Sequence, residues 1–131
     1  NLSGAGINVG VWEATETASA GFGVRNTHES LTGRVTVEEV SNFSNHATHV
    51  AGTVASNGVT AGTEGMTPAA GLSSYGSGND ANEMTAAKTS AGGAGDPLPI
   101  RISNHSYGIG IGWSGKVFDR LECPVSAVPP E

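Results

Sequence analysis

The sequence predicts an α/β fold, a three-layer, doubly wound and mostly parallel sheet. Residues 7–12 (Ile-Asn-Val-Gly-Val-Trp) form a nearly continuous apolar run, which is typical of a strand buried on both faces. Residues 45–56 carry small and apolar side chains at helical spacing. Further segments then alternate between strand and helix, the order in which parallel doubly wound sheets are built.

The helix is expected to begin just before His46. Ser44 or Asn45 is a natural N-cap, which places His46 in the first helical turn. The partial positive charge of a helix N-terminus disfavours the imidazolium and keeps the ring neutral near neutral pH, as a general base must be. Because the residues that follow have little bulk, we expect close packing on a sheet and a rigid, buried platform for the histidine.

The other elements are predicted from local patterns. Residues 33–40 alternate apolar and polar side chains and indicate a half-exposed strand. Asp80, with Glu83 three positions later, predicts a capping box for a helix that reaches about residue 90. The remaining expected segments are a short strand at residues 72–75, a glycine and proline linker at 91–99 and an irregular tail at 114–131.

Composition excludes several classes of function. The 131 residues fit one domain, and 20 glycines with 5 % aromatic residues favour thin layers of side chains. A net charge of −6 without any cluster of Lys or Arg argues against nucleic-acid binding. The single Cys123 excludes an internal disulfide framework and a cysteine-based metal site. No stretch predicts a membrane span or a signal peptide.

Glu13 stands directly after the first predicted strand. Open parallel sheets place their chemistry just beyond the carboxyl ends of the strands, so an acid at this edge is well sited for catalysis. The alternative is a solvated carboxylate that merely ends a strand.

Residues 46–53, His-Ala-Thr-His-Val-Ala-Gly-Thr, resemble the active-site histidine motif of the subtilisin-like serine peptidases, the subtilases. The family usually has glycine where Ala47 stands. The resemblance implies that His46 is the catalytic base. Subtilases carry an Asp after the first strand, roughly thirty residues before this histidine, and Glu13 lies 33 positions before His46. Glu13 is therefore expected to orient His46 by accepting a hydrogen bond from its ring, although Glu is one methylene longer than Asp.

Residues 104–108, Asn-His-Ser-Tyr-Gly, resemble the subtilase strand that ends in Asn-x-Ser-x-Gly. The resemblance implies that Ser106, Tyr107 and Gly108 bind an extended polypeptide substrate through main-chain hydrogen bonds. An ordinary core strand is the alternative. His28 with Glu29 resembles a short His and acid element of the family, for which we expect a structural hydrogen-bond role.

Two parts of a serine peptidase are missing from the sequence. Neither the Gly-Thr-Ser motif that opens the nucleophile helix nor the Ala-Gly-Asn segment that supplies the oxyanion donor is present. Residues 89–91, Thr-Ser-Ala, precede the substrate strand and lack the glycine. The resemblance covers about residues 6–113, so we expect 1–131 to be a single, incomplete catalytic domain, its N-terminal half. It should be inactive without the missing C-terminal half, which would be its partner.

Other readings of the sequence stay open. A non-catalytic module could bind peptides or a partner chain through the edge at residues 106–108. His46 and His49 lie at i and i+3, but zinc peptidase helices use i and i+4, so we expect no metal there and a packed or internally bonded His49. No cofactor is expected. The resemblance allows a structural calcium site, but the sequence has no Asp-rich ligand spacing that would predict one. The resemblance also implies that the protein is secreted.

Overall fold

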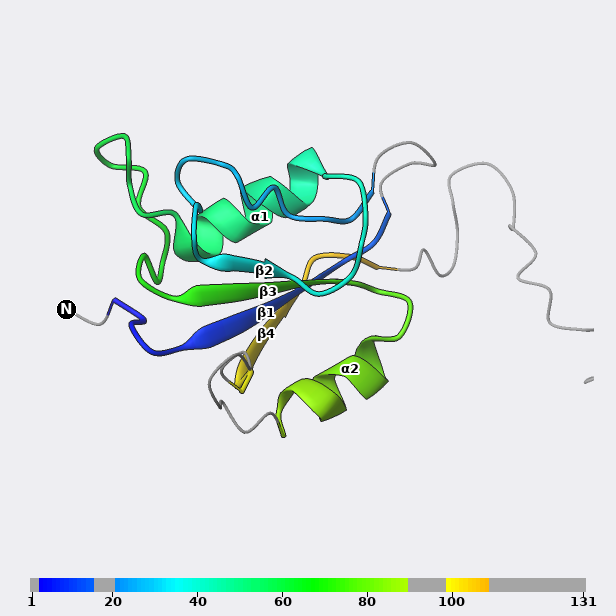
Figure 1. The fold of residues 1–131 in the computed structure, drawn as a ribbon. Helices are drawn as coiled ribbons and strands as arrows, with labels where there is room; N and C mark the ends of the chain where they lie inside the picture. The colour runs from blue at the N-terminus through cyan, green and yellow to red at the C-terminus, as the bar shows by residue number, and fades with distance from the viewer. Residues whose placement is uncertain (1–2, 16–20, 90–98, 109–131) are drawn as a thin grey trace, which may run out of the picture.

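The fold is a four-stranded parallel sheet with one helix on each face (Figure 1). The computed structural model describes residues 3–15, 21–89 and 99–108. Its elements in chain order are β1 (Asn8–Glu13), β2 (Val35–Val37), α1 (Asn45–Ala55), β3 (Gly71–Gly76), α2 (Asp80–Ala87) and β4 (Ile102–His105). The strand order is β2-β3-β1-β4, and every neighbouring pair is parallel. The predicted three-layer α/β architecture is confirmed, as a small and incomplete sheet.

Strand β1 lies in the middle of the sheet and is buried along its whole length. Side chains alternate between the two faces of a strand. Val9 and Val11 join the core under α1, whereas Trp12 stacks on Tyr75 on the other face. Because residue 13 has the same parity as 9 and 11, the side chain of Glu13 is directed to the α1 face. The alternation of side chains along β1 therefore directs Glu13, its last residue, towards the helix that carries His46.

Gly10 is required by the indole of Trp12, which lies two residues further along β1. A Cβ built at Gly10 would come within 2.0 Å of the Trp12 ring. The absence of that atom lets the large ring lie flat along the strand.

Helix α1 packs on the sheet through a stripe of alanines. Ala47, Ala51 and Ala55 are fully buried, and their spacing of four residues places them on one helical face. The helix ends where the next loop binds its free carbonyl groups, since Met66 N–H donates to Thr53 O at 3.0 Å. The other such bonds are Thr67 N–H to Val54 O at 2.8 Å and Gly65 N–H to Ser56 O at 2.9 Å.

Strand β2 is shorter than the predicted residues 33–40. Only Val35–Val37 pair with β3, and Val40 is fully exposed. Beyond Val37 the Glu38 N–H still donates to the Ser74 carbonyl at 3.1 Å, whereas the Gly76 N–H donates to the Glu39 carboxylate at 2.5 Å. A side chain thus satisfies a backbone group of β3 that a longer β2 would otherwise bind. The alternating pattern could not reveal this competition.

The predicted capping box at α2 is wrong. The N-cap is Asn79, whose side chain makes no capping bond, and Asp80 already lies within the helix. Both carboxylates have tertiary partners, Tyr107 for Asp80 and Trp12 for Glu83. The helix ends at Ala87 rather than near residue 90.

The strand expected at residues 72–75 is confirmed as β3, one residue longer at each end. The linker from residue 91, the tail at 114–131 and Cys123 lie outside the described residues, apart from residue 99. In the described part of the chain, no helix has the length and apolar character needed to cross a membrane.

Candidate active site

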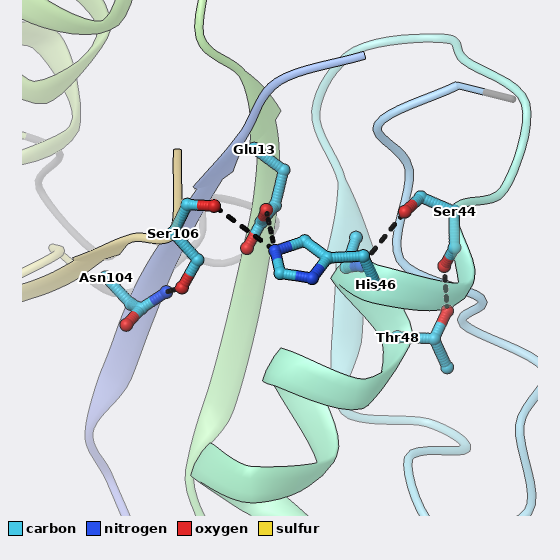
Figure 2. Close-up of polar contacts among 7 residues, drawn as sticks. Glu13, Ser44, His46, Thr48, Asn104 and Ser106 are labelled. Carbon is cyan, nitrogen blue, oxygen red and sulfur yellow. Dashed lines mark hydrogen bonds and ion pairs between the residues drawn. The ribbon is translucent and has the colours of Figure 1, made fainter. Parts of the chain in front are cut away.

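Helix α1 begins with a complete N-cap at Ser44. The Ser44 backbone is extended (φ −106°, ψ 134°), and its hydroxyl oxygen accepts a hydrogen bond from the Ala47 N–H at 3.0 Å. The Thr48 hydroxyl donates to the Ser44 carbonyl at 2.7 Å. Ser44 is itself buried. These bonds fix the first helical turn, so the cap determines where His46 stands (Figure 2).

The carboxylate of Glu13 lies against the imidazole of His46. The distance from Glu13 Oε2 to His46 Nε2 is 3.2 Å. The Glu13 side chain is only 1 % exposed, so the alternative of a solvated carboxylate at a strand end is wrong. Transfer of a carboxylate out of water is costly unless a polar or charged group faces it, and the His46 ring is such a group. The structure therefore brings together the two residues that the sequence singled out.

The backbone carbonyl of Ser106 is a second group at the same ring nitrogen. Ser106 O is 3.2 Å from His46 Nε2. The segment after β4 reaches this point because β4 pairs directly with β1, so both strands end at the same edge. The Asn104 side-chain amide donates to the Ser106 hydroxyl at 2.8 Å. The imidazole thus lies between the end of β1 and the segment that follows β4 (Figure 2).

The expectation of a rigid, buried platform for His46 is right for the helix and wrong for the side chain. The helix is anchored by its alanine stripe, but the His46 side chain is 46 % exposed. A helix on the face of a sheet buries one stripe and leaves the other sides open unless a further layer covers them. No described helix or strand covers this side of α1, so His46 has a firm base while about half of its side chain stays open to solvent.

The outer face of α1 is the floor of a cavity of about 990 Å³. Its walls come from residues 25–31 and 60–66. His49 lines this cavity and is exposed, so the expectation that its side chain packs inside is wrong. His28 makes the predicted local structural bond, since its Nδ1 accepts from the Ser30 N–H at 3.3 Å. Within the described ranges, no group of three or more His, Cys, Asp or Glu side chains could hold a metal ion.

Tyr107 is tied to helix α2. Its hydroxyl donates to the carboxylate of Asp80, the first residue of α2, and lies 3.0 Å from His105 Nδ1. The bond to Asp80 raises the pKa of Tyr107 to about 12, and burial adds to the effect. Gly108 is exposed, and a Cβ there would meet open space. The sequence shows no pattern that pairs residues 80 and 107, so Asp80 was missed as a residue of this region.

Three aromatic rings stack across adjacent strands on the sheet face opposite α1. The Trp12 and Tyr75 ring centroids are 4.4 Å apart, and those of Trp12 and His105 are 5.2 Å apart, with nearly parallel planes. The Trp12 indole N–H donates to Glu83 of α2 at 2.9 Å. Burial is the main cause of two raised pKa values in this region. It raises the pKa of Glu83, and it raises the pKa of Tyr75 to about 12. This stack connects β1 to both α2 and the residues around Tyr107.

Strand β4 forms the edge of the described sheet, and its residues are largely exposed. In the described part of the sheet, β4 is therefore an exposed edge strand. The substrate candidates Ser106, Tyr107 and Gly108 follow this edge strand directly.

Comparison with known proteins identifies the family. Residues 21–126 match the subtilase family of serine peptidases, peptidase S8. A search of curated proteins and a search of solved structures found no match. The matched stretch includes His46 and residues 106–108 and begins after Glu13, whose assignment rests on the geometry above. The chain belongs to the subtilase family.

Proposed function

We propose that this chain supplies the base and the acid of a subtilisin-like serine endopeptidase. The observation that carries the proposal is the buried Glu13 carboxylate 3.2 Å from the imidazole of His46. In this role His46 takes the proton of an attacking serine, and Glu13 orients the ring and stabilises the imidazolium that forms. Peptide-bond hydrolysis then requires a serine nucleophile and donors for the oxyanion.

The place of His46 at the start of α1 supports the role of a base. The capped first turn fixes the backbone that carries the ring, and the 46 % exposure of the side chain leaves room for a nucleophile to approach. A base needs both a fixed position and access.

The substrate is proposed to be an extended polypeptide bound along residues 106–108. This segment follows the edge strand β4, and an edge strand offers main-chain groups to an added strand. The Ser106 carbonyl already reaches the His46 ring, so a peptide on this segment would lie beside the base.

The chain alone is proposed to be inactive, since its sequence has neither the Gly-Thr-Ser nor the Ala-Gly-Asn motif. The test is hydrolysis of a chromogenic peptide by the chain alone and by the chain mixed with a polypeptide that carries the nucleophile half of a subtilase. We expect no hydrolysis alone and hydrolysis in the mixture. His46→Ala should abolish it, and His49→Ala, three residues along the same helix, should not.

Two results would contradict the proposal. Hydrolysis by the chain alone that disappears in His46→Ala would mean that a nucleophile within this sequence has been overlooked. Hydrolysis in the mixture that survives His46→Ala would mean that the base lies elsewhere.

A second candidate is a non-catalytic module that binds an extended peptide. The exposed edge strand β4 favours it, because main-chain pairing at an edge needs no catalytic group. Titration with an extended peptide separates the two functions: a pure binding module keeps its peptide affinity in His46→Ala and gains no activity in the mixture.

A further inference from the structure

One ring nitrogen of His46 faces two acceptors. Nε2 is 3.2 Å from Glu13 Oε2 and 3.2 Å from the Ser106 carbonyl oxygen. A carboxylate and a carbonyl can only accept hydrogen bonds, so neither can face the lone pair of a bare nitrogen favourably. Figure 2 shows both dashed lines ending on the same nitrogen.

We propose that neutral His46 in this chain is the Nε2–H tautomer, so that its basic nitrogen is Nδ1. This is the reverse of the usual serine peptidase arrangement, in which the acid binds Nδ1–H and Nε2 takes the proton of the serine. The inference rests on the proposed function, because it concerns the same acid and base. Glu13 is then the positioning residue that selects the tautomer. The Ser106 carbonyl, a second acceptor at the same nitrogen, favours the same tautomer.

The length of the glutamate side chain brings its carboxylate to Nε2. Strand β1 directs residue 13 at the first turn of α1, and Glu extends one methylene further than the Asp of the family pattern. An aspartate at the same backbone position would end short of Nε2. The extra carbon therefore lets the carboxylate reach this nitrogen.

The consequence is a resting state that a serine cannot use directly. A hydroxyl that approaches Nε2 meets a hydrogen rather than a lone pair. The ring must first turn about its side-chain bonds so that the carboxylate binds Nδ1. The 46 % exposure of the side chain leaves space for that turn. A peptide bound at residues 106–108 would favour it by drawing away the Ser106 carbonyl.

Two other histidines serve as internal references for the tautomers. His28 Nδ1 accepts from the Ser30 N–H, so neutral His28 carries its proton on Nε2. The Tyr107 hydroxyl gives its hydrogen to Asp80, so its oxygen accepts from His105 Nδ1–H. His28 and His105 thus provide one reference for each neutral tautomer.

The test is a long-range proton–nitrogen correlation spectrum of the ¹⁵N-labelled 131-residue chain. It is recorded in mildly alkaline buffer, well above the ordinary histidine pKa of about 6.5, and each histidine is assigned by a His→Gln variant. The cross-peak pattern distinguishes the two neutral tautomers. We expect His46 to match His28. A match with His105 would overturn the proposal.

Glu13→Asp separates this inference from the proposed function. It keeps the charge but withdraws the carboxylate from Nε2, so it should move the His46 signals away from the Nε2–H pattern while those of His28 and His105 stay unchanged. If the His46 signals do not move, Glu13 and His46 are not in contact, and the proposed acid and base pair fails with the tautomer. If they move but start from the Nδ1–H pattern, the pair stands and only the reversed tautomer is wrong.

Discussion

The hydroxyl of Tyr107 donates a hydrogen bond to the carboxylate of Asp80, 27 positions earlier in the chain. The bond joins the segment after β4 to the first residue of α2. It lowers the pKa of Asp80 and raises the pKa of Tyr107 to about 12. A substrate-binding candidate is therefore held in place by a residue on the far helix.

Asp80→Asn should bring the pKa of Tyr107 down toward the ordinary tyrosine value of about 10. The hydrogen bond to the Asp80 carboxylate is the main cause of the raised pKa, and a neutral amide oxygen is a weaker acceptor for the phenol. The measurement is ultraviolet titration of tyrosinate. The chain has only two tyrosines, and burial is the main cause that raises the pKa of Tyr75 to about 12, so Tyr75 is the control. If Tyr107 and Tyr75 both titrate in Asp80→Asn as they do in the wild type, the hydrogen bond between Tyr107 and Asp80 is absent.

The same shift predicts a loss of stability in alkali. The folded state holds Tyr107 protonated up to a pKa of about 12, whereas an unfolded tyrosine loses its proton at about 10. The stabilisation is complete below about pH 10 and disappears as the pH rises through 12. Denaturant midpoints across this range should fall more steeply for the wild type than for Asp80→Asn.

The contact between Glu13 and His46 should appear as coupling in a double-mutant cycle. His46→Ala should lower the free energy of unfolding by about 1–3 kcal/mol, because it removes a partner from a buried carboxylate. In the Glu13→Gln variant the same change should cost less, since no charge remains to be compensated. Urea unfolding of the four proteins should give a coupling of about 0.5–3 kcal/mol. Additive effects would contradict the contact.

Ser44→Ala should destabilise the chain by about 1 kcal/mol, since it removes the acceptor for the Ala47 N–H. The matched control is Asn79→Ala at the N-cap of α2, where no side-chain capping bond exists, with an expected cost of at most about 0.5 kcal/mol. Thermal unfolding compares the two. Equal costs would mean that the cap at Ser44 does not hold α1.

Two neighbouring positions in α1 should respond in opposite directions. Gly52→Ala should stabilise the chain by about 0.5–1 kcal/mol, because a Cβ there meets open space and alanine is the better helix former. Ala51→Leu should cost about 1–3 kcal/mol, because Ala51 is fully buried against the sheet. Chemical unfolding checks both. A destabilised Gly52→Ala would indicate that another part of the chain lies over Gly52.

Elements specified by their own residues were predictable. The apolar run before Glu13 gave β1 to within one residue, and Ser44 gave the start of α1, because both signals act over a few neighbouring positions. The predictions for Asp80 and Glu83 were wrong because each carboxylate binds a residue from another element. A local pattern could not show that competition.

The sequence by itself determined the family, the parallel α/β class and the place of His46 in the first turn of a capped helix, because the period of side chains and the chemistry of the cap are local. Only the tertiary structure decided which groups meet that histidine. The pairing of β1 with β4 brings the Ser106 carbonyl to the ring, and the reach of one extra methylene sets Glu13 on Nε2. Distances of this kind depend on the register between strands far apart in the chain.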